Sequence, residues 1–116
     1  MTKPRDQAAL DYYRAVLLSL GRVRGYIEWK KLPLQWLTIN LPDIRVEVVH
    51  ELMISHIESG GRIHQVLERR PEFVQWRFHY DLRLPISNRL IYIESVLDQG
   101  KTIEDGLIVI VNMHDR

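Results

Sequence analysis

The stretch "VQWRFHYDLRLPISNRLIYIESVLD", Val74 to Asp98, decides the expected fold, because its apolar residues recur at every second position. A period of two is typical of a β-strand with one buried face, and it holds on both sides of the segment "PISN". We therefore predict a β-hairpin in which Pro85 to Asn88 form the turn.

The first strand of this hairpin has an apolar face and a polar face. We expect the apolar face to be buried, because each aromatic ring removes on the order of 150 to 250 Å² from water. This face consists of Trp76, Phe78, Tyr80, Leu82 and Leu84. The opposite, open face then carries Arg77, His79, Asp81 and Arg83.

The residues before the hairpin show the period of helices instead. Apolar residues at steps of three and four predict one helix over residues 7–27, which Gly21 and Gly25 weaken, so that a kink or an early end stays open. A second helical stripe follows Asp43, a suitable N-cap, and ends at Gly60. Pro33 opens a short helix between the two, and Pro42 closes it.

Two further segments complete the expected fold. Residues 62–70 are ambiguous between helix and strand, and we favour a helix because their apolar residues alternate poorly. Residues 107–114, "LIVIVNMH", are almost continuously apolar, which is typical of a strand covered on both faces. The chain thus predicts an α+β domain, with two or three N-terminal helices packed on one face of a small, mainly antiparallel C-terminal sheet of three or more strands. We expect one domain over residues 1–116, with a helical part at about 5–70 and a sheet part at about 74–114.

Composition excludes several classes of protein. With 46% hydrophobic and 27% charged residues, the 116-residue chain is typical of a globular domain and not of a disordered segment. The net charge of +1 argues against a surface built throughout for nucleic acid, although a local basic patch stays open. The chain has no cysteine, which excludes disulfides and thiolate metal sites. No apolar run reaches the ~18 residues of a membrane helix, and no signal peptide is recognisable, so we expect a cytoplasmic protein without membrane contact.

The polar face of the first strand permits two interpretations. It can be a solvated face on which Asp81 pairs with Arg77 or Arg83, and such exposed pairs contribute only about 0 to 1 kcal/mol. Alternatively the two arginines bind phosphate, and His79, with an unperturbed pKa of about 6.5, accepts a proton near neutral pH. The sequence alone leaves both interpretations open.

Other residues extend the functional interpretation. Arg69 and Arg70 either belong to a solvated loop or continue the phosphate-binding track. Tyr92 and Glu94 share one face of the second strand, and His114 ends the last strand. Such a set suits the cleavage of RNA by its own 2′-hydroxyl, in which a base takes the proton, cations stabilise the phosphate and an acid protonates the leaving oxygen. This reaction requires no metal.

We expect neither a metal site nor a cofactor. His50 and His56 are six residues apart, which places them on different faces of a helix, and no H-x-x-x-H pattern occurs. His64 and Glu68 can share a helix face, but two ligands do not make a zinc site. The chain also lacks a glycine-rich phosphate loop and a dinucleotide fingerprint.

The segments "FHYDLRLPISNRLIYIESVL" and "LIVIVNMHD" resemble a pattern found in small bacterial proteins of unassigned function. Their order after the helices is similar to the superfamily of barnase, colicin-type and RelE-like toxin ribonucleases, and within it to the MqsR-type mRNA interferases. The resemblance covers about half of the chain, roughly residues 60–115. It implies an active-site role for Tyr92 and a basic active-site residue at Arg83. Glu94 departs from the pattern, which favours a lysine at or next to this position, and its carboxylate would repel phosphate.

The leading functional expectation is therefore a metal-independent endoribonuclease of the toxin type, with RNA as substrate and a cognate antitoxin as protein partner. His79 acts as the base, Arg77 and Arg83 bind phosphate, and Tyr92 and Glu94 have acid or supporting roles. The alternative is a non-enzymatic interaction or accessory module, antitoxin-like or an inactive homologue. The net charge near zero favours this alternative.

Overall fold

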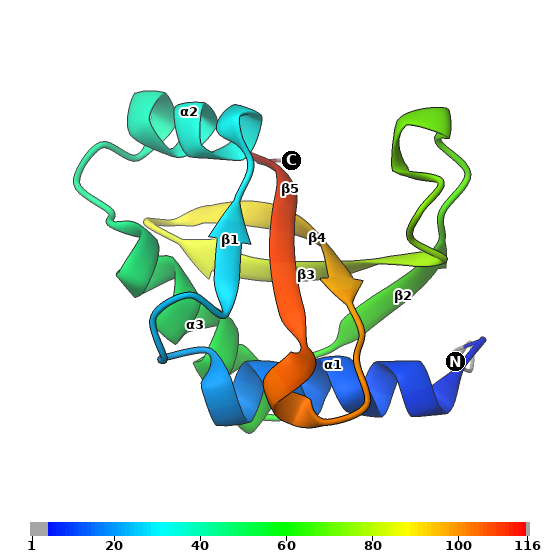
Figure 1. Ribbon diagram of the computed structural model, residues 1–116. Helices are drawn as coiled ribbons and strands as arrows, with labels where there is room; N and C mark the ends of the chain where they lie inside the picture. The colour runs from blue at the N-terminus through cyan, green and yellow to red at the C-terminus, as the bar shows by residue number, and fades with distance from the viewer. Residues whose placement is uncertain (1–4, 116) are drawn as a thin grey trace.

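The protein is an α+β domain, as the sequence predicts, with three helices in its N-terminal half and a five-stranded, mostly antiparallel sheet (Figure 1). The computed structural model describes residues 5–115. The strand order in the sheet is β1-β5-β4-β3-β2, and only the β1–β5 pair is parallel. The elements in chain order are α1 (Gln7–Leu20), β1 (Ile27–Trp29), α2 (Lys31–Asn40), α3 (Val46–Glu58), β2 (Ile63–Leu67), the short 3-10 helix η1 (Pro71–Phe73), β3 (Phe78–Ile86), β4 (Arg89–Asp98), the 3-10 helix η2 (Ile103–Asp105) and β5 (Leu107–Asp115).

The first helix is shorter than its apolar period suggests. It begins after Asp6, whose side chain accepts a hydrogen bond from the amide of Ala9, and it ends at Gly21. A Cβ atom at Gly21 would lie 2.9 Å from the side chain of Ile54, so a glycine lets α1 pack closely on α3. The early end at Gly21 is one of the outcomes that the sequence left open, and the apolar residues up to Ile27 do not continue the helix, because the chain turns away and pairs with β5 as the edge strand β1.

The short second helix and the third helix differ from expectation only at their starts. Pro33 stands at the third position of α2, where an amide hydrogen would have no partner within the helix, so the proline costs no hydrogen bond. The N-cap of α3 is Arg45, two residues after the predicted Asp43. No helix within residues 5–115 is long and apolar enough to cross a membrane.

The predicted helix over residues 62–70 is wrong. Residues Ile63–Leu67 form β2, which pairs antiparallel with β3 so that His64 lies opposite Asp81 and Val66 opposite His79. Residues 63–67 form a strand because they pair with β3, and this pairing gives hydrogen-bond partners to the backbone groups on the side of β3 that faces away from β4. Because β3 lies outside residues 62–70, the spacing of apolar residues within that segment does not indicate the pairing.

The predicted hairpin is confirmed, with a tighter turn than "PISN". Register pairs Ile86 with Arg89, so the turn consists of Ser87 and Asn88 alone. Both residues have positive φ, 52° and 65°, the combination that a type I′ hairpin turn requires. Pro85 lies in the strand, opposite Leu90.

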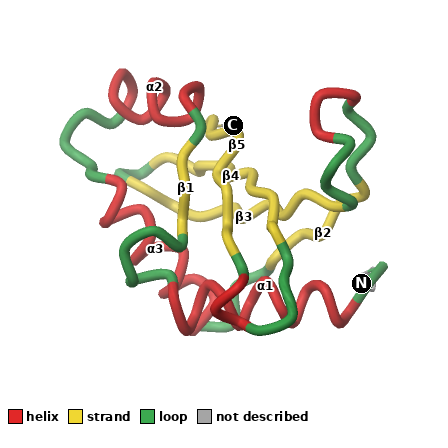
Figure 2. Tube along the Cα trace, in the orientation of Figure 1, coloured by secondary structure: helices red, strands yellow, loops and turns green. Residues whose placement is uncertain are grey.

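The helices pack on one face of the sheet and leave the other face more open. Figure 2 shows the helices in red and the strands in yellow. In the core between the layers the fully buried ring of Tyr13 stacks on Tyr80, with 4.4 Å between ring centroids. Its hydroxyl also bonds to that of Ser95 at 2.7 Å, which ties α1 to β4.

The opposite face is covered at one end only. Trp76 was expected on the core face, but it precedes β3 and packs with Phe73 on the other face, which corrects that prediction. These rings cover Val96 on β4 and Val109 and Val111 on β5. The expectation that the last strand is covered on both faces is therefore confirmed for this part of β5, and the rest of the face stays open.

Candidate functional site on the open face

The register of β3, β4 and β5 arranges most of the predicted site residues on the open face. Arg83 lies opposite Tyr92, which lies opposite His114. We call these three residues the aromatic row. Asp81 lies two residues before Arg83 on β3, and it is opposite Glu94 on β4. With His79 and with Glu68 and Arg70 from the segment after β2, this pair forms a group that we call the carboxylate cluster.

The aromatic row is a continuous stack across three strands. The guanidinium carbon of Arg83 lies 4.9 Å from the ring centroid of Tyr92, in cation–π contact. The rings of Tyr92 and His114 have centroids 5.2 Å apart. Arg83 and His114 are exposed, so the row offers a cation, a phenol and an imidazole to solvent.

Glu68 is the centre of the carboxylate cluster. Its side chain is only 1% exposed, and it accepts bonds from the backbone amides of Arg69 and Arg70 at 3.1 and 3.0 Å. The Arg70 guanidinium donates to both carboxylate oxygens through Nε and Nη2, each at 2.9 Å. These bonds, above all those from the Arg70 side chain, lower the pKa of Glu68 to about 2. Glu68 is therefore ionised throughout the neutral range.

Glu68 also orients His79. The distance from His79 Nδ1 to Glu68 Oε2 is 3.0 Å. A carboxylate only accepts hydrogen bonds, so Nδ1 carries the hydrogen and the lone pair of a neutral ring is on Nε2. The His79 side chain is 14% exposed, and its Nε2 lies 3.8 Å from Oδ1 of Asp81.

Asp81 and Glu94 are two carboxylates placed directly across a strand pair. The Arg70 guanidinium contacts Oε2 of Glu94. Asp81 Oδ1 is buried and has no hydrogen-bond partner among the described residues. Burial raises the pKa of Asp81, and the nearby Glu94 carboxylate adds to this effect.

His64 on β2 also reaches the open face, where it lies opposite Asp81. Partial burial lowers the pKa of His64, and the charge of Arg83 acts in the same direction. A neutral imidazole at this position adds no positive charge beside Arg83 and Arg62.

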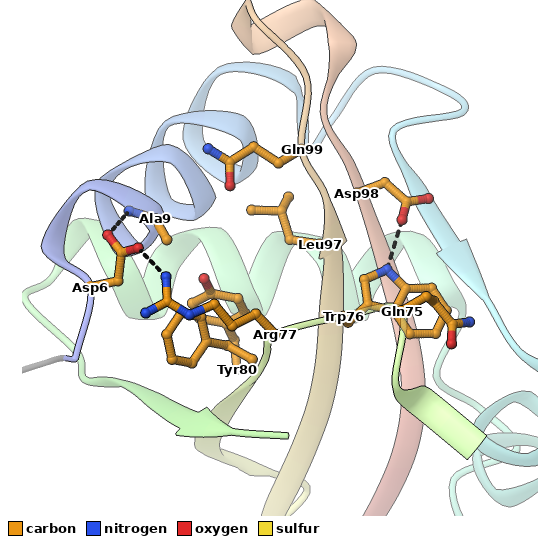
Figure 3. A pocket seen from close by; sticks show the side chains of 10 residues that line it. Asp6, Ala9, Gln75, Trp76, Arg77, Tyr80, Leu97, Asp98 and Gln99 are labelled. Carbon is orange, nitrogen blue, oxygen red and sulfur yellow. Dashed lines mark hydrogen bonds and ion pairs between the residues drawn. The ribbon is translucent and has the colours of Figure 1, made fainter. Parts of the chain in front are cut away.

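Two predicted phosphate ligands lie elsewhere. Arg77 donates to Asp6, just before α1, at 2.9 Å (Figure 3). Its guanidinium also lies over the ring of Phe78. Arg77 lines a cavity of about 390 Å³ between the start of α1, the start of β3 and the end of β4, in which the Trp76 indole donates to Asp98 at 2.7 Å. Arg69 is exposed in the segment after β2 and is not part of either group.

The sequence interpretation missed Glu68 as a site residue. It assigned this residue to a helix, whereas in β2 and its continuation Glu68 follows His64 and Val66 at every second position. A strand assignment for residues 63–67 would have placed Glu68 on the same face as His79. Glu68 was therefore missed because β2 was not predicted as a strand.

Comparison of the chain with protein-family models, with curated protein sequences and with solved structures found no match. The resemblance to the toxin ribonucleases stays a prediction.

Proposed function

We propose that the protein is a metal-independent endoribonuclease of the toxin type, which cleaves RNA through its 2′-hydroxyl. One observation carries the proposal: the ionised and buried Glu68 holds the Nδ1 hydrogen of His79, so Nε2 is available as a base. A buried carboxylate that orients an imidazole is a recurring arrangement around general bases.

In the proposed reaction, Nε2 of His79 accepts the proton of a 2′-hydroxyl. The 2′-oxygen then forms a bond to the adjacent phosphorus, the bond from phosphorus to the 5′-oxygen breaks, and the departing oxygen takes a proton from water. Arg70 shares Glu68 with His79, and its Nη1 takes no part in the bonds to Glu68 and Glu94. This guanidinium supplies the cation for the charge that develops on the phosphate.

The aromatic row acts as a separate binding surface in this proposal. Arg83 follows His79 by four residues on β3, which corresponds to about 13 Å along a strand. This backbone spacing is larger than a single phosphate group. Arg83 therefore binds a neighbouring phosphate, and the rings of Tyr92 and His114 stack with a base.

The test is RNA cleavage by the purified protein in excess chelator, with a single-stranded RNA of mixed sequence. Replacing His79→Ala should reduce the rate about 10²- to 10⁴-fold, because the base is lost. Glu68→Gln should also slow the reaction, because it removes the charge that orients and stabilises the imidazole. The control His56→Ala changes a histidine of α3 that belongs to neither the aromatic row nor the carboxylate cluster. No cleavage by the wild type, or equal cleavage by all variants, contradicts the proposal.

A specific observation favours a second candidate, the interaction module. Leu32 and Ile39 on α2 are 71% and 77% exposed, and their spacing of seven places them on one helix face. Exposed leucine and isoleucine side chains on one helix face are a usual part of protein–protein contacts.

Tagged protein expressed at native level tests this candidate. A stoichiometric partner that is lost from the double variant Leu32→Ser, Ile39→Ser supports it. The matched control is Val74→Ser, which changes an equally exposed side chain, 77%, in the segment before β3. Partner binding that is the same in all variants argues against a role of this helix face.

A further inference from the structure

Three side chains of the carboxylate cluster converge in a way that their hydrogen bonds do not explain. One nitrogen or oxygen atom from each of His79, Asp81 and Glu94 lies within 4.8 Å of the other two. Asp81 and Glu94 are direct partners in the β3–β4 register, and His79 precedes Asp81 by two residues on the same face. The hairpin backbone therefore fixes all three positions.

Asp81 supplies the observation that points to a ligand. Its Oδ1 is buried, with no hydrogen-bond partner among residues 5–115. Such an oxygen is uncommon in folded proteins, because a buried acceptor without a donor loses its hydration and gains nothing in return. The distance of 3.8 Å to Nε2 of His79 is too long for a hydrogen bond. Glu94 makes the position less favourable still, because like charges directly opposite on a strand pair repel.

Neighbouring groups already orient the other two side chains as ligands. Glu68 accepts the Nδ1 hydrogen of His79, and a carboxylate in this position is usual for histidines that bind metal through Nε2. Arg70 contacts only Oε2 of Glu94, which leaves Oε1 outside that contact. Three carboxyl groups, those of Glu68, Asp81 and Glu94, thus lie around the guanidinium of Arg70.

We propose that His79, Asp81 and Glu94 bind one divalent transition-metal cation, with Zn²⁺ the best match to the ligand types. One imidazole nitrogen and two carboxylate oxygens are zinc ligands, and three protein ligands leave a fourth position to water. The spacing of histidines along helices predicted no metal site. The ligands instead come from alternate positions of two paired strands, a pattern that helix spacing does not reveal.

A regulatory consequence of this site rests on the proposed function. The cation takes the Nε2 lone pair that the proposed base needs for the 2′-hydroxyl proton. Zn²⁺ therefore inhibits the cleavage of RNA, and a chelator restores it.

Calorimetric titration of the full chain with Zn²⁺, in neutral buffer stripped of metal and without RNA, tests the site itself. We expect saturable binding of one equivalent by the wild type. Asp81→Asn and Glu94→Gln, which remove a charge at almost constant size, should each weaken the affinity about 10- to 100-fold. Glu68→Gln should weaken it less, because it removes only the group that orients His79. The control His56→Asn should leave the affinity unchanged.

The site is disproved if one-equivalent binding is missing, or if Asp81→Asn and Glu94→Gln bind Zn²⁺ as the wild type does. Melting temperatures without metal show whether each variant folds. If a variant does not fold, the visible absorption spectrum of the wild-type protein loaded with Co²⁺ tests whether the site binds metal. Intense tetrahedral bands support the site, whereas the weak bands of an octahedral, water-like ion disprove it.

Cleavage is measured separately, in chelator and with added Zn²⁺. Zn²⁺ binding without any cleavage in chelator supports the metal site and disproves the proposed function. Cleavage in chelator without Zn²⁺ binding supports the proposed function and disproves the metal site. Cleavage that increases with Zn²⁺ disproves the inhibitory consequence.

Discussion

At the scale of single residues, Glu68 determines the chemistry of the open face. It accepts hydrogen bonds from two backbone amides, from the Arg70 side chain and from His79. Almost no water reaches its side chain, which is 1% exposed, so these donors replace its hydration. The low pKa of Glu68 follows from them.

This low pKa predicts how stability depends on pH. The folded-state value of about 2 lies below the ordinary value of 4.5, so Glu68 stabilises the fold above about pH 4.5, and this contribution is lost as the pH falls through about 2. The loss can reach about 3 kcal/mol of unfolding free energy. Glu68→Gln should lack this part of the pH dependence.

Urea unfolding at several pH values between about 2 and 6 measures the effect. Asp43→Asn, which removes an exposed carboxylate before α3, is the control and should keep the wild-type dependence. The interpretation fails if the Glu68 variant shows the same slope with pH as the wild type.

At the scale of elements, the β3–β4 hairpin positions five of the residues discussed as the site: His79, Asp81, Arg83, Tyr92 and Glu94. Its two-residue turn fixes the register, and a shift by one residue would move every side chain to the other face. The site therefore depends on the backbone conformation of Ser87 and Asn88, both with positive φ.

We predict that Asn88→Val destabilises the protein by about 1 to 2 kcal/mol, because a β-branched residue resists a φ of 65°. Asn88→Gly, which adopts positive φ without strain, should be neutral or stabilising. Thermal or urea denaturation of both variants measures the difference. Equal stability of the two variants would show that the turn does not control the hairpin.

At the scale of the whole molecule, a buried polar link joins the helix layer to the sheet. The Tyr13 hydroxyl on α1 bonds to Ser95 on β4, whose hydroxyl bonds to the Tyr80 carbonyl at 3.1 Å. Full burial raises the pKa of Tyr13, so the phenol stays neutral at all ordinary pH values.

Tyr13→Phe should lower the unfolding free energy by about 1 to 2 kcal/mol, because Ser95 loses a buried hydrogen-bond partner while the ring stack on Tyr80 is kept. Tyr26→Phe, at a half-buried tyrosine beside β1, is the matched control. Urea denaturation should separate the two variants, and identical midpoints would contradict a stabilising role of the link.

Elements held by local interactions could be predicted from the sequence, and elements held by distant partners could not. The hairpin, the last strand and the third helix were predictable, because each places its apolar residues on one face by a local period. The strands β1 and β2 were not, because they depend on distant partners, β5 and β3. Arg77 was placed on the open face by alternation, but its charge is attracted to Asp6, 71 residues away in the chain.

The sequence by itself determined the fold class and the alternation that puts His79, Asp81 and Arg83 on one side of a strand, since both depend on local spacing. Only the tertiary structure decided which of these side chains act together. It brought Glu68 to His79, separated the aromatic row from the carboxylate cluster, and left Asp81 Oδ1 without a partner. The physical reason is that side-chain contacts depend on strand register and on burial, and both arise from pairing between distant segments.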